Sequence, residues 1–237
     1  MKDTVMTDNP KLQLIYFKMR ALAEAPQMLL HAAGIDYEYL MAWEYFEKPW
    51  KEVKNSVIFK QLPILVINET HTIAHSGSIL RYLAGLASMI PSDPVSMYKA
   101  DSILEAAQEM FAPLNPTMNF VIGKDYKERR IEMLPSLASK VDDFERLLTL
   151  EPEAPFFMGN TPCHCDFSVY HHISLAQRMH SNILGNAPHL KRFLSSVQAL
   201  PRVQDYLDQR PELIDVGKAP KLVINGSPVP TGVMRTD

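Results

Sequence analysis

A short apolar segment interrupted by a proline, followed by a helix that starts with a serine, is the most informative feature of the sequence. The segment is Gln61-Leu62-Pro63-Ile64-Leu65-Val66, and the serine is Ser76, preceded by His75. Proline has no N–H and is confined to the starts, edges and bulges of strands. A cis peptide bond between Leu62 and Pro63 would leave the backbone N–H and C=O of Leu62 free. Free groups of this kind can pair with an extended peptide.

The helix expected to begin at Ser76 supplies the second half of a binding site. Apolar residues follow at helical spacing, at Ile79, Leu80 and Leu83. The N-terminus of a helix offers unpaired N–H donors and the positive end of the helix dipole to a carboxylate. A strand edge that pairs with a peptide backbone, beside a helix end that binds an anion, predicts a site for a small acidic peptide.

Each candidate residue also has a purely structural interpretation. Ser76 can be only an N-cap, and Pro63 can be only part of a turn. A tyrosine at the end of a strand, such as Tyr16, is most often a packed ring with a satisfied hydroxyl. Trp50 and Lys54 are four residues apart and can form an ordinary exposed pair on a helix. The combination of these residues in one chain is what favours a functional site.

Strands and helices alternate in the first part of the chain, where they must position these residues. We expect a strand at 12–17, a helix over about 21–33, an edge strand at 37–40, strands at 61–66 and 71–74, and a helix from residue 76. Gly34 suits the end of the first helix because glycine tolerates the left-handed conformation found there. Residues 87–94, which contain two prolines, are expected to form a linker.

The second part of the chain is expected to be helical up to an irregular tail. A long helix is predicted from about Val95 into 121–123, with disturbance at Pro113 and Pro116. Further helices are predicted at 125–150, 166–181, 190–200 and 202–209. From Asp215 onward, frequent proline and glycine predict no regular structure. The sequence therefore predicts an α+β fold with a mixed domain at 10–86, an all-helical domain at 95–212 and an irregular tail at 213–237.

Composition excludes several classes of protein. The chain has 237 residues, 46% of them hydrophobic and 22% charged, which predicts one large or two small folded domains. The net charge is −3, so we expect no nucleic-acid or membrane partner. Residues 1–5 carry charge where a signal peptide would be apolar, and no apolar run approaches the roughly 20 residues of a membrane span. Only Cys163 and Cys165 are cysteines, which predicts a cytoplasmic location.

The segment Cys163-His164-Cys165-Asp166 suggests a metal site, but its spacing does not support one. Zinc sites usually combine C-x₂-C with a second pair of ligands, and here the two cysteines are closer and no second cluster exists. We therefore expect no metal. Cys163 is expected to cap a helix, and Asp166 to accept a hydrogen bond from the N-cap N–H as a structural first-turn acid.

Taken together, these residues resemble those of the cytosolic glutathione transferases, most closely the sigma class and its tyrosine-type relatives, over about residues 12–210. The matching segments are Leu14–Arg20 with Ala23-Glu24, Trp50–Lys54, Gln61–Leu65 and His75-Ser76. The resemblance implies a thioredoxin-like N-terminal domain followed by an all-α helical-bundle domain.

The resemblance also implies a role for each site residue. Tyr16 is placed like the tyrosine that activates the thiol of glutathione, with Arg20 close by to tune it. Trp50 and Lys54 are placed like the pair that holds the glycine carboxylate. Further contacts with glutathione are implied for Gln61, Leu62, Pro63, His75 and Ser76.

Three further assignments follow from the same resemblance. Asp101 is placed like the acid that reaches the γ-glutamyl amine of glutathione in the neighbouring subunit, which implies a homodimer. Cys163 and Asp166 fall where the family has its capping box and buried aspartate. The pocket for the electrophile is expected between the two domains, with Met19, Glu105 and Gln108 as candidate walls.

The sequence departs from the family pattern at several positions. The usual Arg-Gly-Arg-Ala-Glu is here Arg20-Ala21-Leu22-Ala23-Glu24, His75 replaces a glutamine, and Cys163 replaces a serine or threonine. An imidazole offers different hydrogen-bond donors from a carboxamide. The departures therefore affect the surroundings of Tyr16 and one ligand contact, and they leave the rest of the site intact.

The implied function is conjugation of the glutathione thiolate to small, mostly apolar electrophiles. A free thiol has a pKa near 8.5 and is mostly protonated at neutral pH. A phenol O–H donated to the sulfur can stabilise the thiolate. Two alternatives stay open: a glutathione-dependent isomerase like prostaglandin D synthase, and a non-catalytic relative that is crystallin-like or binds ligands. Tyr16 favours an enzyme over the latter.

Overall fold

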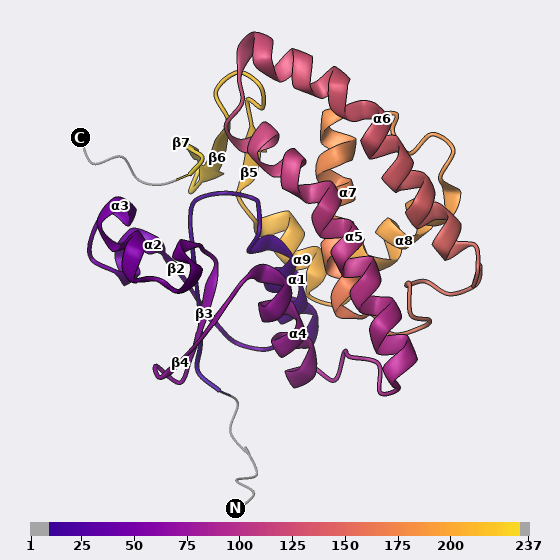
Figure 1. The fold of residues 1–237 in the computed structure, drawn as a ribbon, viewed down its shortest axis with the longest axis horizontal. Coiled ribbons are helices and arrows are strands. Elements are labelled where there is room, and N and C mark those ends of the chain that lie inside the picture. The colour runs from indigo at the N-terminus through magenta and orange to yellow at the C-terminus, as the bar shows by residue number, and fades with distance from the viewer. Residues whose placement is uncertain (1–9, 233–237) are drawn as a thin grey trace, which may run out of the picture.

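A four-stranded mixed sheet forms the core of the N-terminal domain in the computed structural model, which describes residues 10–232 (Figure 1). Its strands are β1 (Leu12–Tyr16), β2 (Glu38–Met41), β3 (Ile64–Ile67) and β4 (His71–Ala74), in the order β2-β1-β3-β4. β2 runs parallel to β1 at one edge, and the other pairs are antiparallel. The predicted strands of this domain are confirmed, including the edge position of β2.

Two helices cover one face of this sheet, α1 (Glu24–Ala33) and α4 (Ser76–Leu86). All four residues of β3 are buried, as expected for a central strand that packs against helices. Gly34 follows α1 with φ of 64° and donates its N–H to the carbonyl of His31, which confirms the predicted end of the helix. The peptide bond between Leu62 and Pro63 is cis.

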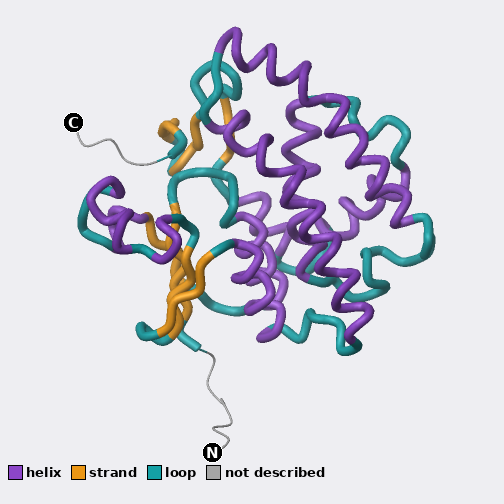
Figure 2. The backbone as a smooth tube through the Cα atoms, viewed as in Figure 1, coloured by secondary structure: helices purple, strands orange, loops and turns teal. Residues whose placement is uncertain are grey.

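A segment for which the sequence predicted no helix or strand lies on the other side of the sheet (Figure 2). It contains two one-turn helices, α2 (Ala42–Tyr45) and α3 (Trp50–Val53), and two 3₁₀ turns over 54–56 and 58–60. Such short elements carry too few residues for a helical period to be recognised in the sequence.

The predicted helices of the second domain are confirmed with shifts of a few residues at their ends. They are α5 (Pro94–Asn119), α6 (Gly123–Leu148), α7 (His164–Met179), α8 (Pro188–Gln198) and α9 (Val203–Gln209). α7 is buried over most of its length because α5 and α1 pack against it (Figure 1). Among the helices within residues 10–232, none has the length and apolar character needed to cross a membrane.

The disturbance expected in α5 at Pro113 and Pro116 does not interrupt the helix. α5 continues through both prolines and ends at Asn119. The buried side chains of Phe111, Leu114 and Met118 hold this half of the helix in the core. Tertiary packing therefore outweighs the loss of two backbone hydrogen bonds.

The prediction of an irregular tail is wrong for most of its length. β5 (Glu212–Ile214), β6 (Lys221–Ile224) and β7 (Ser227–Pro230) form a second, antiparallel sheet. Asn225 and Gly226 make the turn between β6 and β7 with φ of 50° and 76°. Asn-Gly favours the two-residue hairpin turns that need positive φ, and this signal was present in the sequence. Residues 233–237 of the predicted tail, and residues 1–5 considered for a signal peptide, lie outside the described residues.

The tail is attached to both domains beside the end of β1. The N–H of Gly232 donates to the carbonyl of Lys18 at 2.9 Å, and the hydroxyl of Thr231 donates to the carbonyl of Asn119 at 2.6 Å. The tail sheet therefore connects the turn that follows β1 with the end of α5.

A buried ion pair also joins the two domains. The carboxylate of Glu24 in α1 contacts the guanidinium of Arg210, which follows α9, and their side chains are only 5% and 12% exposed. Arg178 donates to the carbonyl of Leu213, and Arg20 donates to the carbonyl of Pro211. These contacts make the segment between α9 and β5 part of the domain interface.

Candidate functional site

A cavity of about 420 Å³ lies where the start of α4 meets the loop before β3 and one side of α5. It brings together most of the predicted contact residues, which lie far apart in the sequence. They are Gln61, Leu62, Pro63, His75, Ser76, Glu105 and Gln108. Leu22, Gly77, Ser78 and Arg81 complete the lining.

The floor of the cavity has a free backbone edge at Leu62. Leu62 and Pro63 are buried, and the ladder between β1 and β3 ends at the pair of Ile15 and Ile64. The backbone of Leu62 therefore lies beyond the last strand pair. This is the arrangement that an extended peptide can join by β-pairing.

The N-terminus of α4 opens into the same cavity. Ser76 is the first residue of the helix and is only 7% exposed, and no side chain caps the helix start. The N–H groups of the first turn are therefore available to a ligand. His75 precedes the helix with φ of 66°, an uncommon conformation for a residue with a side chain, and its ring packs against Phe59 with centroids 4.8 Å apart.

Arg81 lines the cavity, and the sequence analysis missed it. Its Nε donates to Oδ1 of Asp101 and its Nη2 donates to Oε1 of Glu105, both at 2.8 Å. The guanidinium thus neutralises two carboxylates beside the cavity and joins α4 to α5. Arg81 is the only charged residue in the apolar helix α4, a signal that could have identified it.

Tyr16 ends β1 and is not among the residues that line the cavity, but the backbone of Leu22, which lines it, hydrogen-bonds to the Tyr16 hydroxyl. Its side chain is 2% exposed, and burial raises the pKa of its hydroxyl above the ordinary value, although a hydrogen bond from the backbone of Leu22 acts in the opposite direction. The phenol is therefore neutral at neutral pH and keeps its proton. Since the Leu22 N–H occupies an acceptor position of the oxygen, the O–H of Tyr16 can donate to a ligand.

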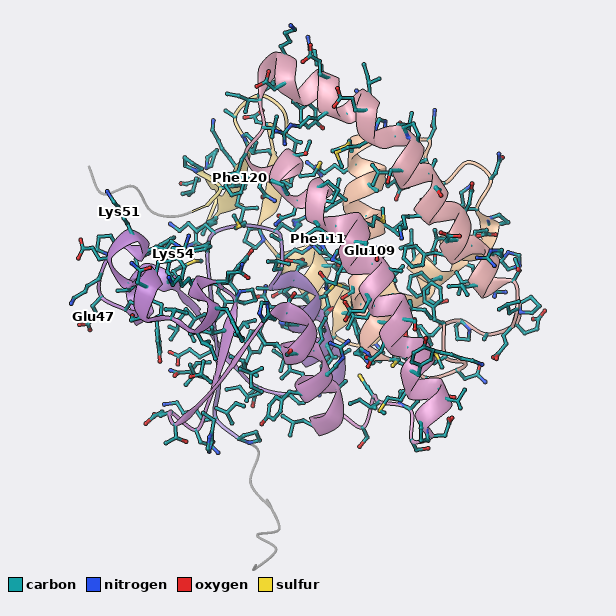
Figure 3. All side chains as sticks on the ribbon, viewed as in Figure 1. Glu47, Lys51, Lys54, Glu109, Phe111 and Phe120 are labelled. Carbon is teal, nitrogen blue, oxygen red and sulfur yellow. The ribbon has the colours of Figure 1, made fainter. Side chains whose placement is uncertain are left out.

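Trp50 and Lys54 are not among the residues that line the cavity. The Trp50 ring packs edge-on against Phe17, with centroids 5.5 Å apart. Lys54 is exposed and follows α3 at the outer side of the sheet (Figure 3). Both residues lie in the segment that contains α2 and α3.

The structure also places Met19 and Arg20 away from the cavity lining. Met19 is 9% exposed and belongs to the hydrophobic core. Arg20 is directed to the carbonyl of Pro211, and burial together with the nearby charge of Arg210 lowers its pKa. Met19 therefore does not line this cavity. It belongs to the turn after β1, which is hydrogen-bonded to the tail through Lys18 and Gly232. Within the described residues, the pKa of Tyr16 is shifted by burial and by the hydrogen bond from the Leu22 backbone, and Arg20 does not contribute to the shift.

Cys163 and Asp166 lie at the start of α7. The carboxylate of Asp166 accepts the N–H of Cys163 at 2.6 Å and the N–H of Phe157 at 3.1 Å. This is a capping box around the helix start. Across residues 10–232, no three His, Cys, Asp or Glu side chains gather in a way that could hold a metal ion.

Comparison with known proteins identifies a family over both domains. The model described as "Glutathione S-transferase, N-terminal domain" matches residues 12–85, and the model described as "Glutathione S-transferase, C-terminal domain" matches residues 114–210. Glutathione S-transferase 1 of Ascaris suum is 23% identical over 208 residues, covering 86% of this chain and 98% of that protein. Glutathione S-transferase Mu 2 of Mus musculus is 27% identical over 203 residues, covering 83% and 90%.

A solved structure has the same fold. The glutathione S-transferase from Ascaris lumbricoides gives a TM-score of 0.76 with 23% sequence identity, and the match covers 86% of this chain and 98% of that one.

Proposed function

The chain belongs to the glutathione S-transferase family, and from that membership we propose that it joins the sulfur of glutathione to small, mostly apolar electrophiles. One observation carries the proposal. The free backbone edge at Leu62 and the uncapped start of α4 open into one cavity, and Leu22 in its lining hydrogen-bonds to the hydroxyl of Tyr16 through its backbone. An extended acidic peptide with a thiol fits this combination of groups.

In the proposed binding mode of glutathione, the site residues contact different parts of the peptide. The backbone of the cysteinyl residue pairs with Leu62, beside Pro63 and Gln61. The γ-glutamyl carboxylate accepts hydrogen bonds from the hydroxyl of Ser76 and the first N–H groups of α4, next to His75. Trp50 and Lys54 are proposed for the glycine carboxylate, since Lys54 supplies an exposed cation in the segment that borders the sheet.

The proposed chemistry is stabilisation of a thiolate by Tyr16. The O–H of Tyr16 donates to the sulfur, and the proton of the thiol leaves to solvent because the phenol is already protonated. Lowering a thiol pKa by about two units requires about 2.7 kcal/mol of preferential stabilisation of the anion. The thiolate then attacks an electrophile held over Glu105 and Gln108, whose proximity to the sulfur supplies further acceleration. Arg20 is proposed as a positioning residue, since its contact with Pro211 fixes the turn after β1.

Ser76→Ala tests the binding site directly. We expect the Kd for glutathione to rise about ten- to a hundredfold, because a hydrogen bond to a carboxylate contributes about 1.5–3 kcal/mol. Isothermal titration calorimetry of the full chain measures the change. Ser96→Ala, which removes a hydroxyl from the first turn of α5 outside this cavity, should leave the affinity unchanged. An unchanged affinity in Ser76→Ala would refute the anion site at α4.

A homodimer is proposed from the surface of α5. Its first turns expose Val95, Met97 and Tyr98 to 63%, 43% and 72%. Asp101 follows Tyr98 by one helical turn and so lies on the same side of the helix. A second copy that covers these apolar side chains would bring its own cavity close to Asp101, whose carboxylate can reach the amine of the bound glutathione.

Light scattering is expected to give about twice the monomer mass of 26.9 kDa at micromolar concentration. Asp101→Asn should weaken glutathione binding about tenfold while the dimer mass stays the same, because the amide cannot pair with a cationic amine. A monomer in solution would contradict the dimer. An Asp101→Asn variant with unchanged affinity would contradict only the role of the carboxylate.

The alternative functions have less support. The curated relatives from Ascaris suum and Mus musculus, which match most of the chain, are named transferases, so neither an isomerase nor a structural protein is favoured. These relatives do not single out one class, and the sigma class therefore stays a prediction. A cytoplasmic location is also proposed, and the two unpaired, buried cysteines support it.

A further inference from the structure

A second group of reactive side chains lies at the start of α7, outside the glutathione cavity. Sγ of Cys163 is 3.2 Å from Nδ1 of His164, and Nε2 of His164 is 3.0 Å from Oδ1 of Asp101. Arg81 in turn holds this oxygen of Asp101 through its Nε. A thiol, an imidazole and a carboxylate in this order form the arrangement that activates a nucleophile.

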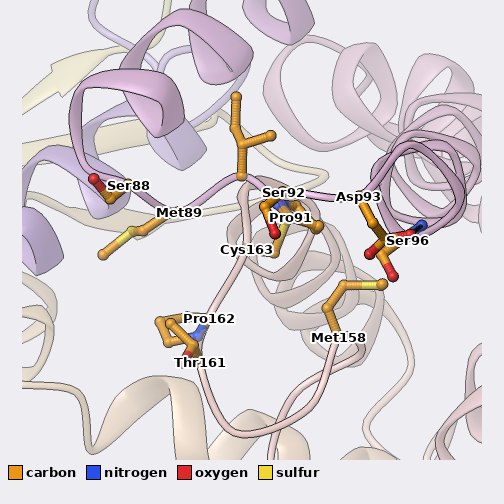
Figure 4. A pocket seen from close by; sticks show the side chains of 11 residues that line it. Ser88, Met89, Pro91, Ser92, Asp93, Ser96, Met158, Thr161, Pro162 and Cys163 are labelled. Atoms are coloured by element: carbon orange, nitrogen blue, oxygen red, sulfur yellow. Dashed lines mark hydrogen bonds between the residues drawn. The ribbon is translucent and has the colours of Figure 1, made fainter.

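A separate cavity of about 350 Å³ opens beside the sulfur of this group. The linker residues 88–93 form one wall, and the loop residues Met158, Thr161 and Pro162 form the other, with Cys163 between them (Figure 4). Its lining consists of serine and threonine hydroxyls, apolar side chains and one carboxylate, that of Asp93. Because no lysine or arginine is part of this lining, the cavity is suited to an uncharged molecule.

The surroundings of Cys163 favour its thiolate. A hydrogen bond from Cys165 lowers the pKa of Cys163, burial opposes this, and His164 lowers it further, to about 5. The N-terminus of α7 adds the positive end of a helix dipole. Although burial lowers the pKa of His164, its hydrogen bonds with Cys163 and Asp101 raise that pKa above the ordinary value.

Three carboxylates and one cation complete the electrostatics around this sulfur. On α7, Asp166 lies close by, and burial raises its pKa to about 7, which limits its repulsion of the thiolate. From the side of α5, Asp101 contacts His164, and Asp93 lines the cavity. Arg81 on α4 balances the charge of Asp101. A thiolate at Cys163 can therefore pair with a protonated ring of His164 across their 3.2 Å contact.

The access to the sulfur limits what can react there. Cys163 is 2% exposed, so its sulfur can accept one added atom more easily than a bulky adduct. The carboxylate of Asp93 disfavours anionic reagents such as glutathione disulfide. We propose that Cys163 is an oxidisable nucleophile that reduces small, uncharged hydroperoxides entering through this cavity.

The reaction consumes one thiolate and one hydroperoxide. The sulfur attacks the terminal oxygen of ROOH, an S–O bond forms, and the O–O bond breaks. Cys163 is oxidised to the sulfenic acid with the OH of the reagent, and the hydroperoxide is reduced to the alkoxide. The imidazolium of His164 gives its Nδ1 proton to the alkoxide, so the products are Cys–SOH, ROH and neutral imidazole.

Sulfenic acid trapping tests the proposal. The full-length protein is treated with one equivalent of cumene hydroperoxide and then quenched in urea that contains dimedone, so that the oxidised sulfur becomes accessible, and peptide mass spectrometry locates the adduct. We expect one adduct on Cys163 in the wild type, the same adduct in Cys165→Ser, and none in Cys163→Ser. Serine is a favoured N-cap, so Cys163→Ser should keep the melting temperature and the conjugation activity. Equal labelling in Cys163→Ser and wild type, or no labelling at all, would overturn the proposal.

The pH dependence separates an activated thiolate from an ordinary thiol. Between pH 6 and 7 the labelling rate of wild type should stay nearly constant, because Cys163 is already ionised, whereas free glutathione should react about tenfold faster at pH 7 than at pH 6. In His164→Asn the labelling rate should depend more steeply on pH than in the wild type, because the contribution of His164 to the lowered pKa of Cys163 is lost. A wild-type rate that rises tenfold over this range would refute activation, whether or not the variant folds. Preferential formation of a mixed disulfide with glutathione disulfide would refute the choice of an uncharged hydroperoxide.

Discussion

Replacement of Tyr16 by phenylalanine is expected to lower the turnover of glutathione conjugation by about ten- to a hundredfold. The variant keeps the ring that packs at the end of β1 and loses only the hydroxyl that can donate to sulfur. A hydrogen bond to a charged group contributes about 1.5–3 kcal/mol, which corresponds to this loss of rate. Glutathione binding should change little, because Leu62 and Ser76 hold the rest of the peptide. Steady-state kinetics and calorimetry together measure both effects.

The pH–rate profile should change in the same variant. If the hydroxyl lowers the pKa of the bound thiol as proposed, the reactive thiolate of the wild type is present above that lowered pKa and is lost as the pH falls through it. Without the hydroxyl the thiol pKa returns toward about 8.5, and the rising limb of the profile moves to higher pH. Tyr39→Phe is the matched control, because the Tyr39 hydroxyl donates to the carbonyl of Phe17 instead. Normal turnover and an unmoved profile in Tyr16→Phe would assign the activation of sulfur to another donor.

Removal of the Glu24 carboxylate should produce the largest loss of stability. Glu24→Ala leaves the buried guanidinium of Arg210 without its partner, and Arg20 lies close enough for its charge to repel Arg210. Breaking a buried ion pair on one side costs about 3–5 kcal/mol. For a chain of this size that corresponds to a fall in melting temperature of roughly 10 °C. Thermal and denaturant unfolding of the full chain measure the change.

A double substitution distinguishes the buried charge from lost packing. Glu24→Leu combined with Arg210→Met removes both charges and keeps apolar volume, so much of the lost stability should return. If Glu24→Ala alone costs less than about 1 kcal/mol, the pair behaves like an exposed salt bridge and does not hold the domains together.

The sequence predicted the parts of the fold and site that depend on local signals. Pro63 marks the start of β3, Gly34 ends α1, and Ser76 begins α4, and each of these acts through its own backbone conformation. The cavity residues around Leu62 and Ser76 could be predicted because they lie at the ends of these elements.

Contacts between distant segments could not be predicted in this way. The direction of Arg20 depends on its contact with Pro211, at the start of a tail whose strands the sequence analysis missed. The prolines in that region outweighed the signal of Asn225-Gly226. Arg81 was missed because its role depends on a hydrogen bond with Asp101, which lies on a different helix. Long-range pairing of this kind leaves no period in the sequence.

The attachment of Gly232 to Lys18 sets an order of events during synthesis. A ribosome releases the chain from the N-terminus, so the first strand and the turn beside Tyr16 emerge long before their last hydrogen-bond partner. The nascent N-terminal domain can form its sheet early, but the turn that follows the tyrosine stays without the contact from Gly232 until residue 232 has left the exit tunnel. The turn after Tyr16 is thus translated more than 200 residues before the backbone group that completes its hydrogen bonding.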